Sequence, residues 1–211
     1  MRLLHLVSTI SIAFLALSEI TFATKNTMKS DSIHDTTQAS DETASEERRG
    51  AVGGGGRELP TPAPLPPGVY LGKEFGGPHG YRFTDVDMVK SGQKVVSISI
   101  RSHGRVDAVS LDIVLPAGDK NTLYHGGNGG KMNTTALAEG EHITHIEANW
   151  GHTRYIKFTT NLGKVIEGGR RTDSVDVDKA KEGFQLGGFI GRSGDEVDMV
   201  GAIWTSIQPV E

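Results

Sequence analysis

An internal repeat constrains the fold of this chain more than any other feature of its sequence. Residues 101–109 (RSHGRVDAV) align without gaps on residues 192–200 (RSGDEVDMV), and residues 75–81 (FGGPHGY) align on residues 125–131 (HGGNGGK). Self-similarity of this kind is typical of stacked or symmetric units. The alternative is coincidence in a chain with 28 glycines among its 211 residues. The repeat predicts units that each hold a glycine-rich loop and a strand–loop–strand hairpin.

Short candidate strands begin after Gly68 and continue almost to the end of the chain. Their apolar residues alternate or form short runs, and turn signals separate them at intervals of about ten residues. No stretch of the sequence has convincing helical periodicity. The pattern predicts an all-β domain, built as a sandwich, a barrel or a prism. The candidate strands are residues 95–100, 106–114, 142–146, 155–160, 183–190 and 199–207.

The first residues have the composition of a secretion signal. Arg2 supplies a positive charge, residues 3–17 are mostly apolar, and Thr21-Phe22-Ala23 places small residues for cleavage after Ala23. The apolar run is short for a membrane span. We therefore expect residues 1–23 to be a signal peptide, and the mature chain to be secreted, extracellular and not inserted into a membrane.

Residues 24–67 are expected to form a disordered tail and linker. Residues 25–50 hold almost no large apolar side chains, and the glycines and prolines that follow favour a hinge and an extended spacer. The run Ser45-Glu46-Glu47-Arg48-Arg49 is similar to the acidic Glu-Glu-Arg motif of secreted oomycete effectors, although their upstream Arg-x-Leu-Arg motif is missing. This run is either a solvated linker or a targeting or processing segment.

Composition excludes some classes of function and of fold. The formal net charge is -4, so no basic surface argues for a nucleic-acid partner. The chain has no cysteine, so a secreted domain cannot use disulfides and depends on its hydrophobic core. Residues 68–211, the expected folded domain, are long enough to bury such a core.

An acidic loop is the clearest candidate for a binding site. Residues 191–201 (GRSGDEVDMVG) read as a strand, a tight loop and a second strand, with Asp195 and Asp198 beside Gly194. Such a loop offers carboxylate acceptors and bare N–H donors to a small polyhydroxylated ligand, and hydrogen bonds to carboxylates are charge-assisted. The alternative is a solvated turn, because aspartate favours turns.

These motifs, taken in order, resemble those of the jacalin-related lectins. The resemblance covers about residues 68–208 and rests on residues 75–77, 101–109, 125–130, 156–161 and 188–194. It implies a β-prism of three four-stranded antiparallel sheets around a pseudo-threefold axis. It also implies a carbohydrate-binding protein that is not an enzyme and needs no metal or other cofactor.

The resemblance assigns a carbohydrate site to particular residues. Asp198 would accept hydrogen bonds from two neighbouring sugar hydroxyls, and backbone N–H groups of the acidic loop would donate. Gly194 would permit the turn and a close approach of the ligand to the backbone. The glycine of the first loop is Gly80, next to His79 where the family usually has glycine. Trp150 would supply an aromatic wall, with packing in the core as its alternative role. The expected site residues are Gly80, Trp150, Gly194, Asp195, Glu196, Val197 and Asp198.

The resemblance extends to ligand class and partners. Galactose-preferring members are cut before the first-loop glycine, whereas Gly80 lies inside an uncut chain, as in the mannose- and glucose-preferring subclass. The expected partners are glycans or glycoproteins. Because a shallow site binds a monosaccharide only in about the millimolar range, avidity would need several sites or a homo-oligomer. The repeat places a second candidate site at Asp107, Gly129 and Gly130.

Other functions remain as alternatives to sugar binding. A glycosidase needs two carboxylates that flank a bond, whereas Asp195 and Asp198 point the same way on a hairpin. Residues 173–178 alternate like a calcium loop but lack its glycine and terminal glutamate, so we expect a solvated loop there. An effector-like protein-interaction module could keep the fold without binding sugar. Asn133-Thr134-Thr135 is an N-glycosylation sequon, expected in a surface loop.

Overall fold

A computed structural model describes residues 63–151 and 153–211 of the chain. The predicted signal peptide, most of the predicted tail and His152 lie outside these described residues. The described part consists of twelve strands and one short 3-10 helix, η1 (Val86–Met88). Among these residues no helix is long and apolar enough to cross a membrane.

The strands form three four-stranded antiparallel sheets, as the resemblance implied. The strand orders are β1-β12-β11-β2, β5-β4-β3-β6 and β10-β7-β8-β9. The first sheet contains β1 (Val69–Gly76), β2 (Tyr81–Thr84), β11 (Phe184–Ser193) and β12 (Val197–Ser206). The second contains β3 (Lys94–Ser102), β4 (Val106–Val114), β5 (Lys120–Gly126) and β6 (Lys131–Ala136). The third contains β7 (Ile143–Asn149), β8 (Tyr155–Thr160), β9 (Val165–Gly169) and β10 (Val175–Lys179).

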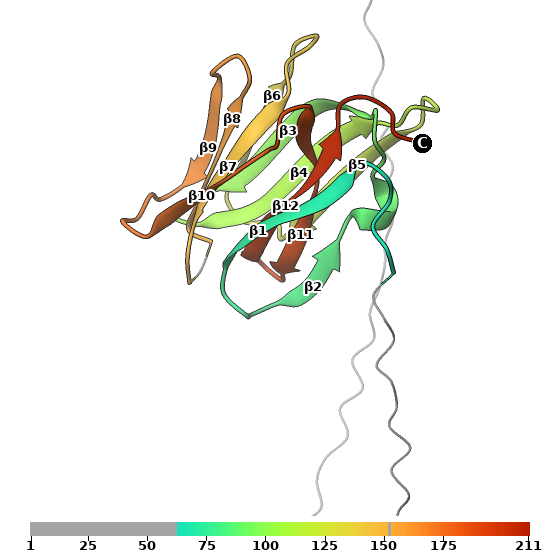
Figure 1. The fold of residues 1–211 in the computed structure, drawn as a ribbon. Helices are drawn as coiled ribbons and strands as arrows, with labels where there is room; N and C mark the ends of the chain where they lie inside the picture. The colour runs from blue at the N-terminus through green and yellow to red at the C-terminus, as the bar shows by residue number, and fades with distance from the viewer. Residues whose placement is uncertain (1–62, 152) are drawn as a thin grey trace, which may run out of the picture. The chain divides into compact units, whose positions relative to one another are not determined.

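The first sheet joins the two ends of the domain. Val69 of β1 pairs with Thr205 of β12, and Tyr81 of β2 pairs with Ser193 of β11. Figure 1 shows the teal strand β1 alongside the red strand β12. The other two sheets are each built from four consecutive strands, so the first sheet is the one that needs long-range pairing.

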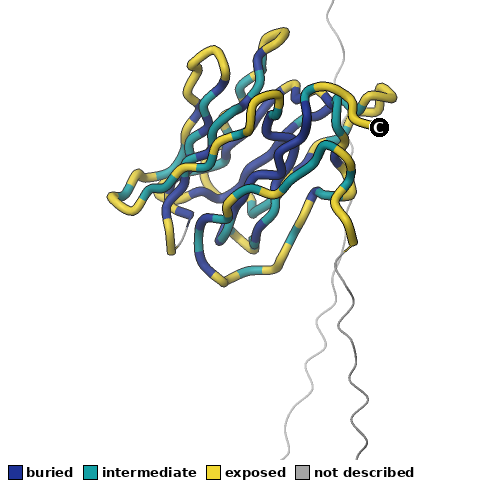
Figure 2. Tube along the Cα trace, in the orientation of Figure 1, coloured by how far each residue is buried: buried dark blue, intermediate teal, exposed yellow. Residues whose placement is uncertain are grey.

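The inner faces of the three sheets share one hydrophobic core. Phe158 of the third sheet lies 6.0 Å from Phe189 of the first, measured between ring centroids. Trp204 of β12 is fully buried, and its indole N–H donates to Asp178 at 2.9 Å. Figure 2 shows the buried residues in the central strands and the exposed ones in the loops and at the outer strands. This core takes the place of disulfides in stabilising the domain.

The predicted repeats are structurally equivalent, and the third sheet completes a pseudo-threefold pattern. In each sheet the last residue of one edge strand is a glycine with positive φ, next to a carbonyl oxygen of the facing hairpin. A Cβ on these glycines would lie 2.2, 2.1 and 2.0 Å from that oxygen, so only glycine fits. The glycines are Gly76, Gly126 and Gly169, and the oxygens belong to Asp198, Asp107 and Arg154 respectively.

Two predictions of local structure are wrong. The acidic segment expected to be a solvated loop contains β10, in which Val175 pairs with Asn149 and Lys179 with His145. Asn133 was expected in a surface loop, but it lies in β6, where its side chain is exposed. Both strands are sheet edges with polar sequences, because an edge strand buries less of its side-chain surface than a central one.

Candidate functional site

Loops from all three sheets meet at one end of the domain. Gly77, between β1 and β2, lies so close to Gly151, between β7 and β8, that a Cβ on Gly77 would be 2.1 Å from its carbonyl oxygen. Gly127, between β5 and β6, lies equally close to the backbone of Asp195. The β3–β4 hairpin joins this group through a hydrogen bond from the N–H of Val106 to the β7–β8 loop.

The structure brings Asp198 and Gly80 into contact. Gly80 has a φ of +68°, and a Cβ there would lie 2.4 Å from Oδ2 of Asp198, so the position requires glycine. Asp198 is only 7% exposed, yet its carboxylate has no hydrogen-bond or ion-pair partner in the described part of the chain. This carboxylate is therefore an open acceptor beside the glycine loop.

The acidic loop connects β11 to β12, as the sequence predicted. The N–H of Gly194 donates to the carbonyl oxygen of Glu196 at 3.0 Å and closes the turn. Asp195 is exposed at the tip. The side chain of Val197 is buried in the core, so Val197 can offer a ligand only its backbone. The side chain of Glu196 turns toward the neighbouring repeat, where it pairs with Arg105.

One of the two expected reasons for a glycine at position 194, the turn, is wrong. The φ of Gly194 is not positive, and a Cβ on this residue would meet no atom within 4 Å. The turn itself therefore accepts a side chain. The close approach of a ligand to the backbone is the remaining physical reason for glycine at this position.

Equivalent arginines hold the glycine loops of the first two repeats. Arg192 Nε donates to the carbonyl oxygen of His79 at 3.0 Å, and Arg101 donates to that of Gly130 at 3.1 Å. These bonds explain why both copies of the repeat contain arginine. The ring of His79 lies near Gly77, with Cδ2 at 3.8 Å from the position of a Cβ on that glycine.

Trp150 lies at the edge of this group of loops. Its side chain is half exposed, its ring packs edge-on against Phe75 at 5.9 Å, and the Lys73 ammonium lies 5.2 Å from the ring centroid. Trp150 is therefore not a core residue. Its neighbour Gly151 touches the first glycine loop, and its role as a wall of the site stays a prediction.

The second candidate site has the same backbone arrangement as the first. Asp107 is 3% exposed, and Cβ atoms on Gly129 and Gly130 would each lie 2.6 Å from one of its carboxylate oxygens. Beside these residues is an open cavity of about 770 Å³. Its lining residues are His103, Gly104, Arg105, Asp107, Gly129, Gly130, Arg154 and Glu196.

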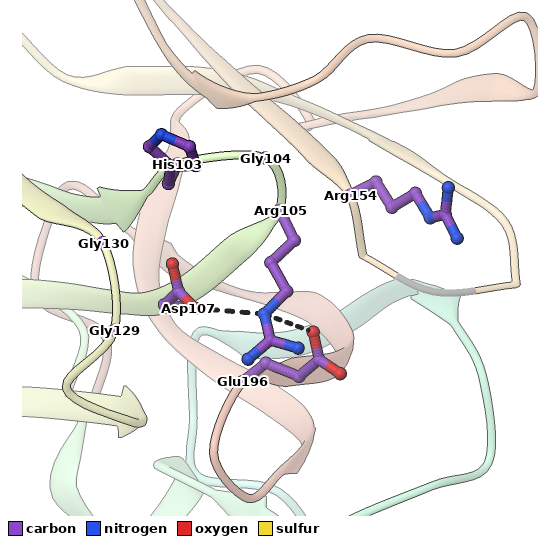
Figure 3. Close-up of a pocket in the computed structure, with 8 residues that line it drawn as sticks. All are labelled: His103, Gly104, Arg105, Asp107, Gly129, Gly130, Arg154 and Glu196. Atoms are coloured by element: carbon purple, nitrogen blue, oxygen red, sulfur yellow. Dashed lines mark hydrogen bonds and ion pairs between the residues drawn. The ribbon is translucent and has the colours of Figure 1, made fainter.

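Arg105, which lines this cavity, was not among the site residues predicted from the sequence. Its Nε donates to Asp107 Oδ1 at 3.1 Å and lies 2.9 Å from Glu196 Oε2, so one guanidinium joins two repeats (Figure 3). The hydrogen bond to Asp107 raises the pKa of Arg105, and the charges of Glu196 and Asp195 act in the same direction. The sequence did contain a signal, since Arg105 aligns on Glu196 with opposite charge.

The third repeat differs at the position of the carboxylate. Arg154 takes the place of Asp198 and Asp107, since its carbonyl oxygen accepts the equivalent hydrogen bond from Arg170 at 2.7 Å. Its side chain is exposed and points away from Arg105 and Glu196 in Figure 3. A cation at this position cannot accept a hydrogen bond from a hydroxyl. Within the described residues, no group of three or more His, Cys, Asp or Glu could hold a metal ion.

Comparisons with known proteins match this arrangement to one family. The family model of the jacalin-like lectin domain matches residues 72–203. Secreted RxLR effector protein 19 of Plasmopara viticola is 28% identical over 139 residues, which are 61% of this chain and 77% of that protein. The effector-like tail of the present chain agrees with this relative.

Two plant proteins are among the solved structures with the same fold. AcmJRL, a mannose-binding jacalin-related lectin from Ananas comosus, superposes with a TM-score of 0.58 at 23% identity, over 66% of this chain and 99% of that one. Calystegia sepium agglutinin gives a TM-score of 0.55 at 23% identity, over 66% of this chain and 98% of that one. At these identities the comparison establishes the β-prism fold.

Proposed function

The chain belongs to the jacalin-like lectin domain family, and from that premise we propose that it is a secreted lectin that binds mannose- or glucose-type glycans. The proposed site lies between the first glycine loop and the acidic loop. Its residues are Gly80, Trp150, Gly194, Asp195, Glu196, Val197 and Asp198. The matched solved structures are of lectins, which bind carbohydrate and do not act as enzymes.

The carboxylate of Asp198, which lies beside the glycine loop, is the observation that carries this proposal. It accepts no hydrogen bond from the described residues, so both of its oxygens can accept from a ligand. Two neighbouring sugar hydroxyls would donate to these oxygens through charge-assisted hydrogen bonds. Gly80 supports this role, because any side chain at position 80 would occupy the space beside Oδ2 of Asp198.

The other residues have complementary roles in this proposal. The backbone N–H groups of Gly80 and of residues 195–197 donate to sugar oxygens. Gly194 leaves room for the sugar to approach the main chain, since nothing else surrounds it within 4 Å. Trp150 offers an exposed ring to an extended glycan. The side chain of Glu196 pairs with Arg105, so Glu196 offers the sugar its backbone N–H.

The proposed subclass rests on the sequence around Gly80. No obvious processing signal lies beside this glycine, so we expect no cleavage there and no new amino terminus that would select galactose. The mannose-binding lectin from Ananas comosus shares the fold. Both points support a mannose or glucose preference.

A competition experiment on residues 24–211 tests this function. We expect binding to mannose-terminated glycans that methyl α-mannoside inhibits in about the millimolar range, that methyl β-galactoside does not inhibit, and that a chelator leaves unchanged. Preference for galactose would contradict the proposed subclass. Silence toward all glycans, with the β-fold intact by circular dichroism, would favour the protein-interaction alternative, which the similarity to a secreted effector supports.

We also propose how the protein reaches its ligand. Residues 1–23 direct secretion, residues 24–67 form the tail, and residues 68–211 are the lectin domain. The secreted relative supports this order. Asn133, exposed on the edge strand β6, is a candidate for N-glycosylation in the secretory pathway.

A further inference from the structure

We infer that Arg105 closes a second sugar pocket in this chain, and that it does so by occupying the carboxylate of Asp107. This inference rests on the proposed function, because it takes the first repeat as the model of an open site. Under this inference a single side chain, that of Arg105, decides whether one domain binds one sugar or two.

The second pocket has the backbone features of the first. The glycine loop touches the carboxylate in both, through Gly80 beside Asp198 and through Gly130 beside Asp107. Gly130 has a φ of +60° and Gly80 one of +68°. The cavity of about 770 Å³ lies within the usual size range of small-ligand sites. The contact between glycine loop and carboxylate therefore does not distinguish the two pockets.

The state of the carboxylate does distinguish them. Asp198 has no side-chain partner among the described residues, whereas Asp107 Oδ1 accepts from Arg105 Nε at 3.1 Å. A neutral sugar hydroxyl would have to replace a charge-assisted bond with one from an uncharged donor, which is weaker. The Asp107 side chain is 4% exposed and that of Arg105 is 48% exposed, so the hydrogen bond reaches into a nearly buried carboxylate from a guanidinium that solvent partly screens.

The repeat explains why the first pocket stays open. The residue of the acidic loop equivalent to Arg105 is Glu196, which has no donor to offer to Asp198. Glu196 instead reaches Arg105 at 2.9 Å and holds the guanidinium from the opposite side (Figure 3). A charge reversal at one position of the repeat thus leaves one site free and closes the other.

Per-residue NMR titration of residues 24–211 with methyl α-mannoside tests the inference. In the native protein, we expect the amide resonances of Gly80 and Asp198 to shift as the sugar is added, and those of Gly129 and Gly130 to stay unchanged. In R105A both groups shift, and the affinity at the second pocket rises at least about tenfold over the native protein, as expected from the loss of one competing charge-assisted bond. In R105A/D107A the second group is silent again.

A conservative variant separates charge from bulk. Arg105→Lys keeps a cation that can reach Asp107, so the second pocket is expected to stay closed in it. If R105K opened the pocket as fully as R105A, the ion-pair account would be wrong. Silence of Gly129 and Gly130 in R105A, or their saturable shift in the native protein, would overturn the inference whether or not Gly80 and Asp198 respond. If only Gly80 and Asp198 failed to respond, the signals of Gly129 and Gly130 would still test this inference. The missing response would count against the proposed function.

Discussion

Replacing Asp198 with alanine is expected to abolish binding of mannose-type glycans while leaving the stability of the domain nearly unchanged. Two charge-assisted hydrogen bonds are lost, which corresponds to at least about a hundredfold in affinity. The carboxylate has no hydrogen-bond or ion-pair partner among the described residues, so its removal breaks no such contact. Glycan binding and the melting temperature should be measured on the same preparation.

An exposed aspartate at a distant loop provides the matched control. Asp119 lies in the β4–β5 turn with its side chain in solvent, so Asp119→Ala should change neither binding nor stability. Parallel loss of binding and melting temperature in Asp198→Ala would show that this residue supports the fold instead of the ligand. Retained glycan binding would place the site elsewhere on the domain.

The two tryptophans are expected to differ widely in their contribution to stability. Trp204→Ala should cost about 3–5 kcal/mol, because it leaves a cavity in the core and removes the N–H donor to Asp178. That is a large part of a total that is roughly 5–15 kcal/mol for a domain. Trp150→Ala, at a side chain that is 48% exposed, should cost about 1 kcal/mol or less.

Urea unfolding followed by circular dichroism measures this difference. Trp204→Ala should strongly lower the urea concentration at the unfolding midpoint, with little change in how steeply the free energy of unfolding depends on urea. Trp150→Ala should leave the midpoint nearly unchanged. Equal effects of the two substitutions would contradict the placement of Trp204 in the core and Trp150 at the surface. The Trp150 variant also reports on glycan binding, where a loss without loss of stability would support its role as a wall of the site.

The central strands could be predicted from the sequence, whereas several edge strands could not. β4 and β8 begin and end at the residues expected, because both are buried and carry dense apolar patterns. β10 was missed, since its Val-Asp-Val-Asp pattern lies at a sheet edge and reads like a solvated loop. Edge strands make their backbone bonds on one side only, and composition marks such strands weakly.

The site was predictable in part for a similar reason. The resemblance named Gly80 and Asp198, and the structure brings them together. The bond between Arg105 and Glu196 could not be predicted, because it joins two repeats far apart in sequence and depends on the packing of their loops. The turn requirement expected of Gly194 was wrong, because the sequence does not reveal that the φ of this residue is not positive.

A crystal structure of residues 24–211 with methyl α-mannoside tests the central claim most directly. The account predicts one sugar between the first glycine loop and the acidic loop, with two hydroxyls donating to Asp198 and the N–H groups of Gly80 and Val197 donating to sugar oxygens. A sugar bound at another surface, with the carboxylate of Asp198 still without a partner, would contradict it.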